Sequence, residues 1–307
     1  MVRVRPARLG AVVEEYLLGW VVLAVGAGLV VPELAALARH ATVLLAVMIG
    51  SVSLTLTVAD FRAVDVRDLA PLVAGHLLMP AIAFGVARAL GLSPPLTVGF
   101  VVLGAVTPEL VTPVMTTLAG GSTALSTTAL VLVAPGSALF VPAVVAVLSG
   151  GRVDPWLLAE PLLVAVVVPM LTGVTLRARY PTVIGRHEDA YPALAALMVV
   201  LVIGGVTAAN AGVVRTGGNR LLAVVVGAVA LNLLGYGVGW VAAARAARPE
   251  RIATLLSVGM RDFAVAAAVV VAAGLPTVAS LPAVAFGLVE MITSAGLARR
   301  FAGKSQS

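Results

Sequence analysis

Long apolar segments recur along almost the whole chain, and this feature most restricts what the chain can fold into. A helix needs about 20 apolar residues to cross the hydrocarbon core of a bilayer. Charged residues make up 11% of the 307 residues, against about 25% in soluble domains. The sequence therefore predicts an all-α membrane protein with ten transmembrane helices, surrounded by a lipid bilayer. Their approximate bounds are 16–31, 41–59, 69–90, 95–119, 122–149, 156–176, 191–212, 221–244, 250–274 and 278–298.

Several function classes are not expected from this composition. Cysteine is absent, which excludes disulfides, thiolate metal sites and thiol catalysis. The sequence has no HExxH motif and no serine at a recognisable spacing from an intramembrane base, so we expect no enzyme and no cofactor. The net charge of +6 comes from arginines in short loops, which does not indicate a nucleic-acid partner. No cleavage site follows the basic N-terminus, so the first apolar segment is interpreted as a span.

The distribution of basic residues predicts a multi-pass protein of the plasma membrane with both termini in the cytoplasm. Loops on the cytoplasmic side carry an excess of Lys and Arg. With the N-terminus inside, five basic residues fall in outside loops: Arg39, Arg88, Arg152, Arg215 and Arg220. Fourteen fall inside: Arg3, Arg5, Arg8, Arg62, Arg67, Arg177, Arg179, Arg186, Arg245, Arg248, Arg251, Arg299, Arg300 and Lys304.

The chain divides into two halves of five spans each, residues 1–150 and 151–307. An odd number of spans per half gives the two halves opposite orientations. The fourth span of each half is interrupted, at Thr107-Pro108-Glu109 and at Val258-Gly259, and both spans end in similar phrases, LAGGSTALS and AAGLPTVAS. Interrupted spans at matching places in inverted repeats indicate the binding site of a transporter.

Five ionisable residues fall inside predicted spans: His76, Glu109, Arg261, Asp262 and Glu290. A charge at mid-membrane costs about 3 kcal/mol or more, so such residues usually face a cavity or one another. A guanidinium stays charged and needs anionic partners. Side chains of neighbouring residues do not face each other on a helix, so we expect the Arg261 guanidinium to pair with Glu109 or Glu290 near the membrane centre.

Structural roles remain open for these residues. Thr107, Pro108 and Glu109 read as the N-cap and first turn of a half-helix, and Asp262 opens the second half-helix in the same manner. Arg261 either forms a structural ion pair, or binds an anionic substrate, or replaces a coupling cation.

The histidine, asparagine and hydroxyl side chains in the spans have equally open roles. His76 is more often a hydrogen-bonded packing residue than a ligand, and Asn210 and Asn232 are suited to bridging helices. A group of hydroxyls either coordinates a solute or satisfies backbone carbonyls; it comprises Thr112, Thr116, Thr117, Ser122, Thr123, Ser126, Thr127 and Thr128.

Four stretches of this sequence resemble the bile acid:sodium symporter family: HLLMPAIAFGVARALGL (76–92), PVMTTLAGGSTALSTTALVL (113–132), LNLLGYGVG (231–239) and SVGMRDFAVAAAVVVAAG (257–274). The resemblance implies two inverted five-helix repeats, with a panel of the first, second, sixth and seventh spans that moves against a core. Broken fourth and ninth spans would cross in the core, with two sodium ions behind the crossing and an organic anion in front.

The chain departs from the family's pattern where sodium would bind. In the ninth span, Ser257 takes the place of a family Glu that ligates both sodium ions. Val258 and Met260 take the places of two residues that ligate sodium through the backbone. The family's Gln and Asn in this phrase are Arg261 and Asp262.

Other ligand positions differ as well. The family's Ser-Asn pair in the fourth span is Thr112-Pro113, and its third-span Gln falls at Gly75. Ser126 matches a hydroxyl ligand, but the ligand four residues on is Leu130. The His-Asn pair near the substrate is Glu290-Met291.

We therefore expect a secondary active transporter of small organic anions that does not need sodium and uses protons or exchange. A sodium-coupled symporter with a rearranged cation site, a cationic substrate, and a channel or receptor-like protein remain alternatives, and so do a monomer and a homodimer. Arsenite efflux is not expected, because that branch relies on a cysteine. The predicted substrate-binding residues are Glu109, Thr112, Arg261, Asp262 and Glu290. The predicted cation-binding residues are His76, Ser126, Ser257, Val258 and Met260.

Overall fold

The computed structural model describes residues 17–56 and 64–302, and all regular elements within these residues are helices. The first half holds six main helices: α2 (Leu17–Val30), α4 (Ala41–Ser53), α5 (Val66–Ala89), α6 (Pro94–Ala105), α7 (Thr112–Leu118) and α8 (Thr123–Leu148). Two short helices, η1 (Pro32–Leu34) and α3 (Ala35–Ala38), connect α2 to α4.

The second half begins with one long span in three parts: α9 (Pro155–Leu162), the π-helical turn η3 (Leu163–Val167) and α10 (Val168–Arg179). The other main helices are α12 (Tyr191–Ala209), α14 (Gly218–Ala242), α15 (Arg248–Gly259), α16 (Phe263–Ala272) and α17 (Leu281–Ala302). The short connectors are α11 (Pro181–Gly185), η4 (Glu188–Ala190), α13 (Ala211–Thr216) and η5 (Thr277–Ser280).

Each of the ten predicted apolar segments contains helix, but fewer than ten qualify as spans by length and hydropathy. In the described residues, seven helices are long and apolar enough to cross a membrane, or eight if the pair α2 and Pro32–Ala38, bent by 108°, is one span. Helices α4 and α6 are shorter, and the end of the second predicted span, residues 57–59, lies outside the described residues. The chain is therefore a multi-pass helical membrane protein, and the number ten stays a prediction.

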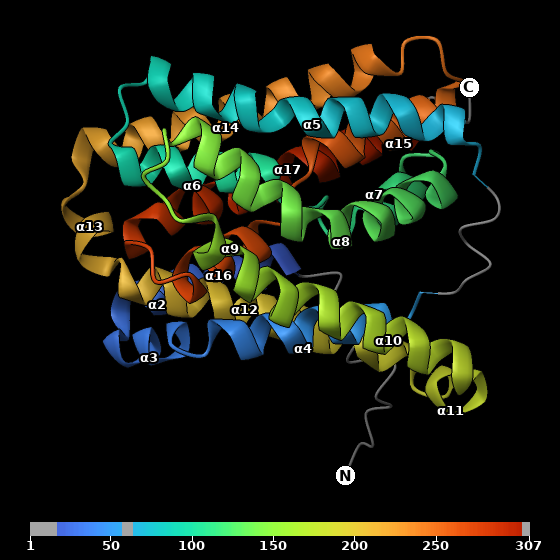
Figure 1. Ribbon diagram of the computed structural model, residues 1–307, viewed down its shortest axis with the longest axis horizontal. Coiled ribbons are helices and arrows are strands. Elements are labelled where there is room, and N and C mark those ends of the chain that lie inside the picture. Colours follow the sequence, from blue (N-terminus) through green and yellow to red (C-terminus); the bar gives the residue numbers. More distant parts are fainter. Residues whose placement is uncertain (1–16, 57–63, 303–307) are drawn as a thin grey trace.

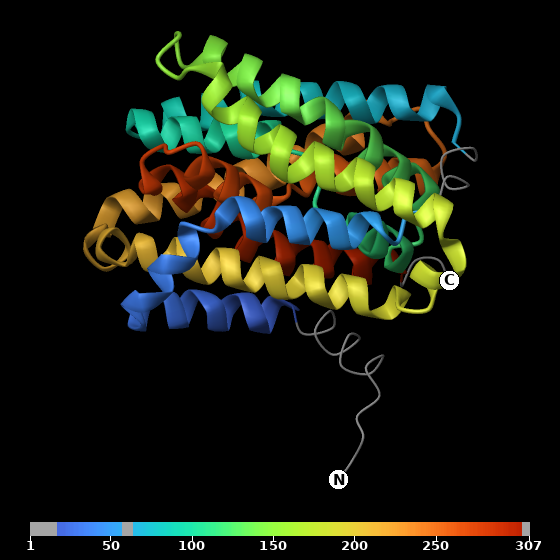
Figure 2. The same ribbon diagram turned by 60° about the horizontal axis from the view of Figure 1, so that its bottom comes forward.

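The helices pack in two groups. Helices α2, α4, α10 and α12, here called the panel group, pack against one another (Figures 1 and 2). Helices α5, α6, α8, α14, α15 and α17 form the other group, which we call the core group. This grouping agrees with the panel and core that the family resemblance implies, since α2, α4, α10 and α12 belong to the first, second, sixth and seventh spans.

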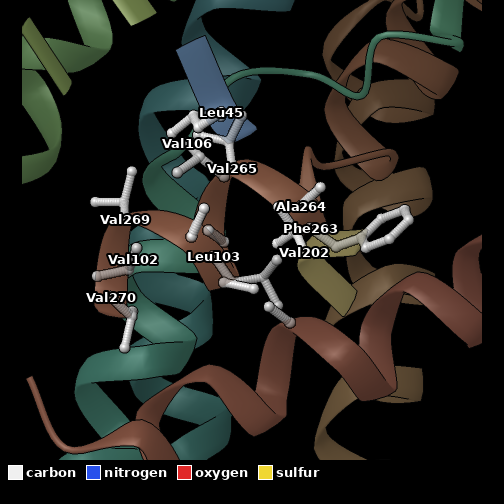
Figure 3. Packing of buried hydrophobic residues seen from close by; sticks show 14 of the residues in the cluster. Leu45, Val102, Leu103, Val106, Val202, Phe263, Ala264, Val265, Val269 and Val270 are labelled. Atoms are coloured by element: carbon white, nitrogen blue, oxygen red, sulfur yellow. The ribbon is translucent and has the colours of Figure 1, made fainter. Parts of the chain in front are cut away.

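Helix α16 joins the two groups, because it contacts α4 and α12 on one side and α6 and α17 on the other. Figure 3 shows Val265 and Val269 of α16 beside Val102 and Val106, all of them buried. A helix that is apolar on all sides is stable only when it is fully surrounded. Residues 263–270 of α16 are all buried by protein and not left open to lipid, so this helix lies at the centre of the molecule.

The two predicted interruptions meet at this centre, and we call residues 106–111 and 260–262 the crossing. The first stretch separates α6 from α7, and the second separates α15 from α16. Val258 and Gly259, where the second break was predicted, are still helical, so that break begins at Met260. The backbone N–H of Asp262 donates a hydrogen bond to the carbonyl of Thr107, with an N···O distance of 3.0 Å. The prediction that the broken fourth and ninth spans lie against each other is confirmed.

The predicted start of the second half-helix in the fourth span is wrong. Helix α7 begins at Thr112, with Val111 at its N-cap and Pro113 in its first turn. Thr107, Pro108 and Glu109 therefore do not form the N-cap and first turn of a helix, but lie in the non-helical crossing. The sequence offers two prolines suited to a first turn, and the second one is used.

Candidate functional site

The five ionisable residues of the predicted spans are all buried around the crossing. Glu109 is 3% exposed, His76 is 2% exposed, and Arg261, Asp262 and Glu290 are fully buried. His76 comes from α5, Glu290 from α17, and the other three from the crossing itself. Four separate parts of the sequence thus bring their charges to one place.

The Arg261 side chain does not form the expected ion pair. Its guanidinium contacts Nδ1 of His76 and donates to the carbonyl of Val106 at 3.2 Å. Its Nε and the other terminal nitrogen have no hydrogen-bond partner among the described residues. The described residues contain one ion pair closer than 4.0 Å, and it joins Arg177 to Glu188.

Glu290 binds the backbone of the crossing instead of the guanidinium. Its carboxylate accepts a hydrogen bond from the backbone N–H of Arg261 at 2.8 Å. A helix break leaves backbone N–H groups without helical acceptors, and these must be satisfied inside a membrane protein. Glu290 meets this requirement, which explains why its carboxylate is not directed at the guanidinium.

Asp262 caps α16, as the sequence predicts. Its Oδ1 accepts from the backbone N–H of Val265 at 2.8 Å, while Oδ2 has no partner among the described residues. The capping role is confirmed for this residue. It also means that a carboxylate already occupies the N-terminus of α16, the end that attracts anions.

Glu109 faces a cavity between the crossing and the panel group. The cavity has a volume of about 330 Å³. Apolar side chains of α2, α4 and α12 form one wall, and Glu109 is the one ionisable residue among its described lining residues. Asp262 and Glu290 lie close enough to interact electrostatically with Glu109, but neither lines the cavity. The wall opposite Glu109 includes Leu17, Val52, Leu56, Ala195, Ala196 and Val199.

The other predicted substrate-binding residues do not line this cavity. Thr112 is fully buried, and its hydroxyl has no hydrogen-bond partner among the described residues. Thr112, Arg261, Asp262 and Glu290 are all absent from the described cavity lining. Their roles as substrate-binding residues remain predictions.

The predicted cation-binding residues lie buried on the core side of the crossing. The Ser257 hydroxyl has no partner among the described residues, whereas Ser126 donates to the carbonyl of Thr123 at 3.0 Å. Val258 and Met260 are buried, and Val258 packs so closely on Gly75 that an added Cβ there would lie 2.8 Å from its Cγ2. A larger side chain at Gly75 would therefore require Val258 to shift. No group of three or more His, Asp or Glu side chains in the described residues is arranged to hold a metal ion.

Helix α14 supports the crossing through a hydrogen-bond network. Asn232 donates to the carbonyl of Gly259 at 3.2 Å and accepts from the Thr293 hydroxyl at 2.7 Å. The hydroxyl of Tyr236 lies 3.2 Å from that of Thr293. Asn210 likewise donates to Ser280 at 3.2 Å. The prediction that Asn210 and Asn232 bridge helices is confirmed.

Two parts of the site have no clear signal in the sequence. The panel wall of the cavity is made of Leu, Val, Ala and Pro, the same residue types that face lipid elsewhere. Tyr236 sits in the apolar eighth span, where a lone tyrosine does not indicate a hydrogen-bond network.

Comparisons with known proteins agree with this architecture. The sequence profile described as the Sodium Bile acid symporter family matches residues 42–217. The chain is also 26% identical over 297 residues to the "Uncharacterized sodium-dependent transporter YocS" of Bacillus subtilis (strain 168), covering 93% of this chain and 90% of that protein. The matched region includes residues 106–111 of the crossing and the cavity residues of α4, α7 and α12. The chain belongs to the sodium bile acid symporter family, and is accordingly a membrane transporter of small solutes rather than an enzyme.

Proposed function

We propose that this protein is a secondary active transporter of small organic anions, which binds its substrate in the cavity beside Glu109. The observation that carries this proposal is the cavity itself, which lies between the panel group and the crossing. Ligand sites in proteins are mostly apolar cavities of about 300–1,000 Å³ with few polar groups. A volume of about 330 Å³ is suited to a small solute.

The proposal includes ten spans in two inverted repeats, residues 1–150 and 151–307, with both termini in the cytoplasm. Figure 1 shows the connectors α3 and α13 at one end of the molecule and α7 and α11 at the other. The arginines predicted to lie outside and inside fall at different ends of the molecule. Arg39 and Arg215, predicted outside, lie at the first end, and Arg177 and Arg186, predicted inside, lie at the second. The excess of arginine at the second end supports a cytoplasmic position for it.

Glu109 supports coupling to protons. Two like charges about 4 Å apart repel by about 4 kcal/mol at an effective dielectric constant near 20. An organic anion therefore enters the cavity beside Glu109 much more readily when that carboxyl is protonated. Loading one anion and one proton together gives symport. An organic cation would instead bind to the ionised form and exchange with a proton.

Arg261 supports independence from sodium. Its guanidinium contacts His76, the residue after Gly75, where the family resemblance places a sodium-binding side chain. A fixed positive charge there opposes a bound cation by the same Coulomb argument. The Glu that would ligate sodium is Ser257, so a cation would meet this repulsion with fewer ligands.

Sodium coupling is the second candidate, and two findings favour it. The printed name of the Bacillus relative includes sodium dependence. In addition, several buried oxygens near the crossing have no hydrogen-bond partner among the described residues: Thr112 Oγ1, Ser257 Oγ, Asp262 Oδ2 and Glu290 Oε1. Oxygens of this kind are the ligands that hard cations prefer.

Uptake into proteoliposomes distinguishes the two. A thermal-shift screen of organic acids on the purified protein first identifies a transported compound. Uptake of that compound is then measured with sodium or choline outside, each with and without an inward proton gradient. We expect uptake to follow the proton gradient equally in both salts. Strict sodium dependence would overturn the proposal in favour of the second candidate, and uptake without saturation or counterflow would indicate a channel.

A further inference from the structure

A second cavity lies at the end of the molecule where α14 ends, α15 begins and α17 ends. Its volume is about 430 Å³, and its described lining residues are Trp240, Arg248, Leu297, Arg300 and Phe301. It shares no residue with the cavity beside Glu109. We call it the Trp240 pocket. The proposed transport function gives it no role.

Aromatic rings and arginines hold the Trp240 pocket in shape. The rings of Trp240 and Phe301 are stacked, with centroids 5.9 Å apart and an interplanar angle of 25°. On Trp240, the Arg251 guanidinium carbon lies 3.7 Å from the ring centroid, and Arg251 Nε donates to the Trp240 carbonyl at 3.0 Å. Cation–π contact and hydrogen bond together fix both side chains. The pocket is thus built from ordered groups.

Among the described residues, no carboxylate forms an ion pair with the arginines of this pocket. Arg248 and Arg300 are exposed, and neither has a carboxylate within 4.0 Å among the described residues. Arg248 donates only to the Phe301 carbonyl, at 3.4 Å, in that part of the chain. The nearby acid is Glu250, in the first turn of α15. Five arginines belong to this end of the three helices: Arg245, Arg248, Arg251, Arg299 and Arg300.

We propose that the Trp240 pocket binds the phosphodiester headgroup of an anionic glycerophospholipid from the surrounding leaflet. Guanidinium groups match phosphate oxygens in geometry and charge. Basic pockets between transmembrane helices bind anionic headgroups, and tryptophan is enriched at the depth of the headgroups. Val241 and Ile292, which are 70% and 62% exposed, give apolar surface for acyl chains on the same helices.

A lipid in this place contacts the first half of the broken ninth span. Arg248 is the first residue of α15, while Trp240 belongs to α14 and Arg300 to α17. The bound headgroup therefore bridges three helices of the core group at their shared end. We expect it to stabilise the packing of α15, whose other end forms the crossing.

Native mass spectrometry of the full-length protein tests the proposal, with phosphatidylglycerol and phosphatidylcholine added at equal concentration. We expect the protein to retain phosphatidylglycerol in preference to phosphatidylcholine. The double variant Arg248→Gln/Arg300→Gln removes the two exposed arginines of the pocket. One arginine near a membrane surface contributes about fivefold to the binding of an anionic lipid, so the affinity of the double variant falls about 25-fold.

Arg245→Gln/Arg299→Gln is the matched control, because it removes two exposed arginines at the same end that do not line the pocket. We expect it to lower the affinity less than the pocket variant does, because neither of its arginines lines the pocket. Glycerol phosphate without acyl chains, added as a competitor, should not displace the lipid at equal concentration. Should the double variant fail to fold, Arg300→Gln alone gives the same comparison, because Arg300 is exposed in the last turn of α17.

Equal losses in the two double variants would overturn the proposal, because they would show a diffuse charge effect. Equal retention of the two lipids by the unaltered protein would overturn it as well. Displacement by glycerol phosphate would show that the pocket recognises a free anion and not a lipid.

Discussion

We predict that replacing Arg261 by Gln allows the protein to bind sodium. The guanidinium is fully buried, and no carboxylate lies within 4.0 Å of it in the described residues. Its contacts there are one imidazole nitrogen and one backbone carbonyl. Its direct partners in the described residues are thus not carboxylates, and Glu290 acts on its charge only at longer range. Gln is also the residue that the family resemblance places at this position.

The magnitude follows from Coulomb's law. A sodium ion bound beside Ser257, about 4 Å from the guanidinium, would experience about 4 kcal/mol of repulsion at an effective dielectric constant of 20. Removing that charge corresponds to a gain of about 1,000-fold in sodium affinity. Glutamate in place of Ser257 would add the missing carboxylate, so Ser257→Glu/Arg261→Gln should bind sodium more tightly still.

The assay is thermal unfolding of purified protein in sodium chloride and in choline chloride, followed by uptake in the same salts. We expect the unaltered protein to unfold at the same temperature in both salts, and Arg261→Gln to be stabilised by sodium. Arg261→Lys is the control, because it keeps a positive charge and should remain insensitive to sodium. Millimolar sodium binding by the unaltered protein, or no gain in Arg261→Gln, would refute the reasoning.

Two further predictions concern the carboxylates. Glu109→Gln mimics a permanently protonated carboxyl. It should therefore abolish substrate accumulation driven by a proton gradient, while counterflow exchange of substrate continues. Loss of both activities would contradict a coupling role. Asp262→Ala should lower the free energy of unfolding by about 1 kcal/mol, because the N-cap of α16 is lost. Thermal unfolding measures this against Asp262→Asn, which keeps an acceptor for the Val265 N–H. Equal stability of the two variants would contradict the capping role.

Much of the arrangement around the crossing was predictable, because charges inside a membrane are costly. That cost alone placed Glu109, Arg261, Asp262 and Glu290 in one buried cluster, and the helix-breaking residues around them located the two interruptions. Asp262 was predicted as a cap because it directly precedes a long apolar helix. These inferences depend on local sequence and on a strong energetic penalty.

Partner choice within the cluster was not predictable from the same argument. Glu290 accepts from the Arg261 backbone, and the guanidinium turns to His76 on α5. Which way a side chain leaves a non-helical stretch depends on backbone angles that the sequence does not specify. The start of α7 was missed for a related reason, since Pro108 and Pro113 both suit a first helical turn.

The cavity was the least predictable part, because apolar residues look alike whether they face lipid, a neighbouring helix or a substrate. Leu17 and Val199 contribute to its wall from distant parts of the chain. Their position follows from the packing of α2 against α12, which is a tertiary property. A family resemblance supplies this kind of information, whereas the periodicity of a fully apolar helix does not.

Gly75 packs closely against Val258, and the cost of a larger side chain at this position can be measured. An added Cβ at Gly75 would lie 2.8 Å from Cγ2 and 3.3 Å from Cγ1 of Val258. Overpacking of a buried position costs about 1–3 kcal/mol, so Gly75→Ala should destabilise the protein by that amount. Gly85→Ala is the control on the same helix, because an added Cβ there meets nothing within 4 Å among the described residues.

Val258→Ala should relieve this clash, so that the double variant Gly75→Ala/Val258→Ala is more stable than the two single changes predict together. We expect a coupling free energy of about 1 kcal/mol or more from thermal unfolding of the four proteins. Such coupling would show that the absence of a side chain at Gly75 and the close packing of Val258 depend on each other. Additive effects would show instead that α5 moves freely away from α15, and that the space at Gly75 remains available for a ligand.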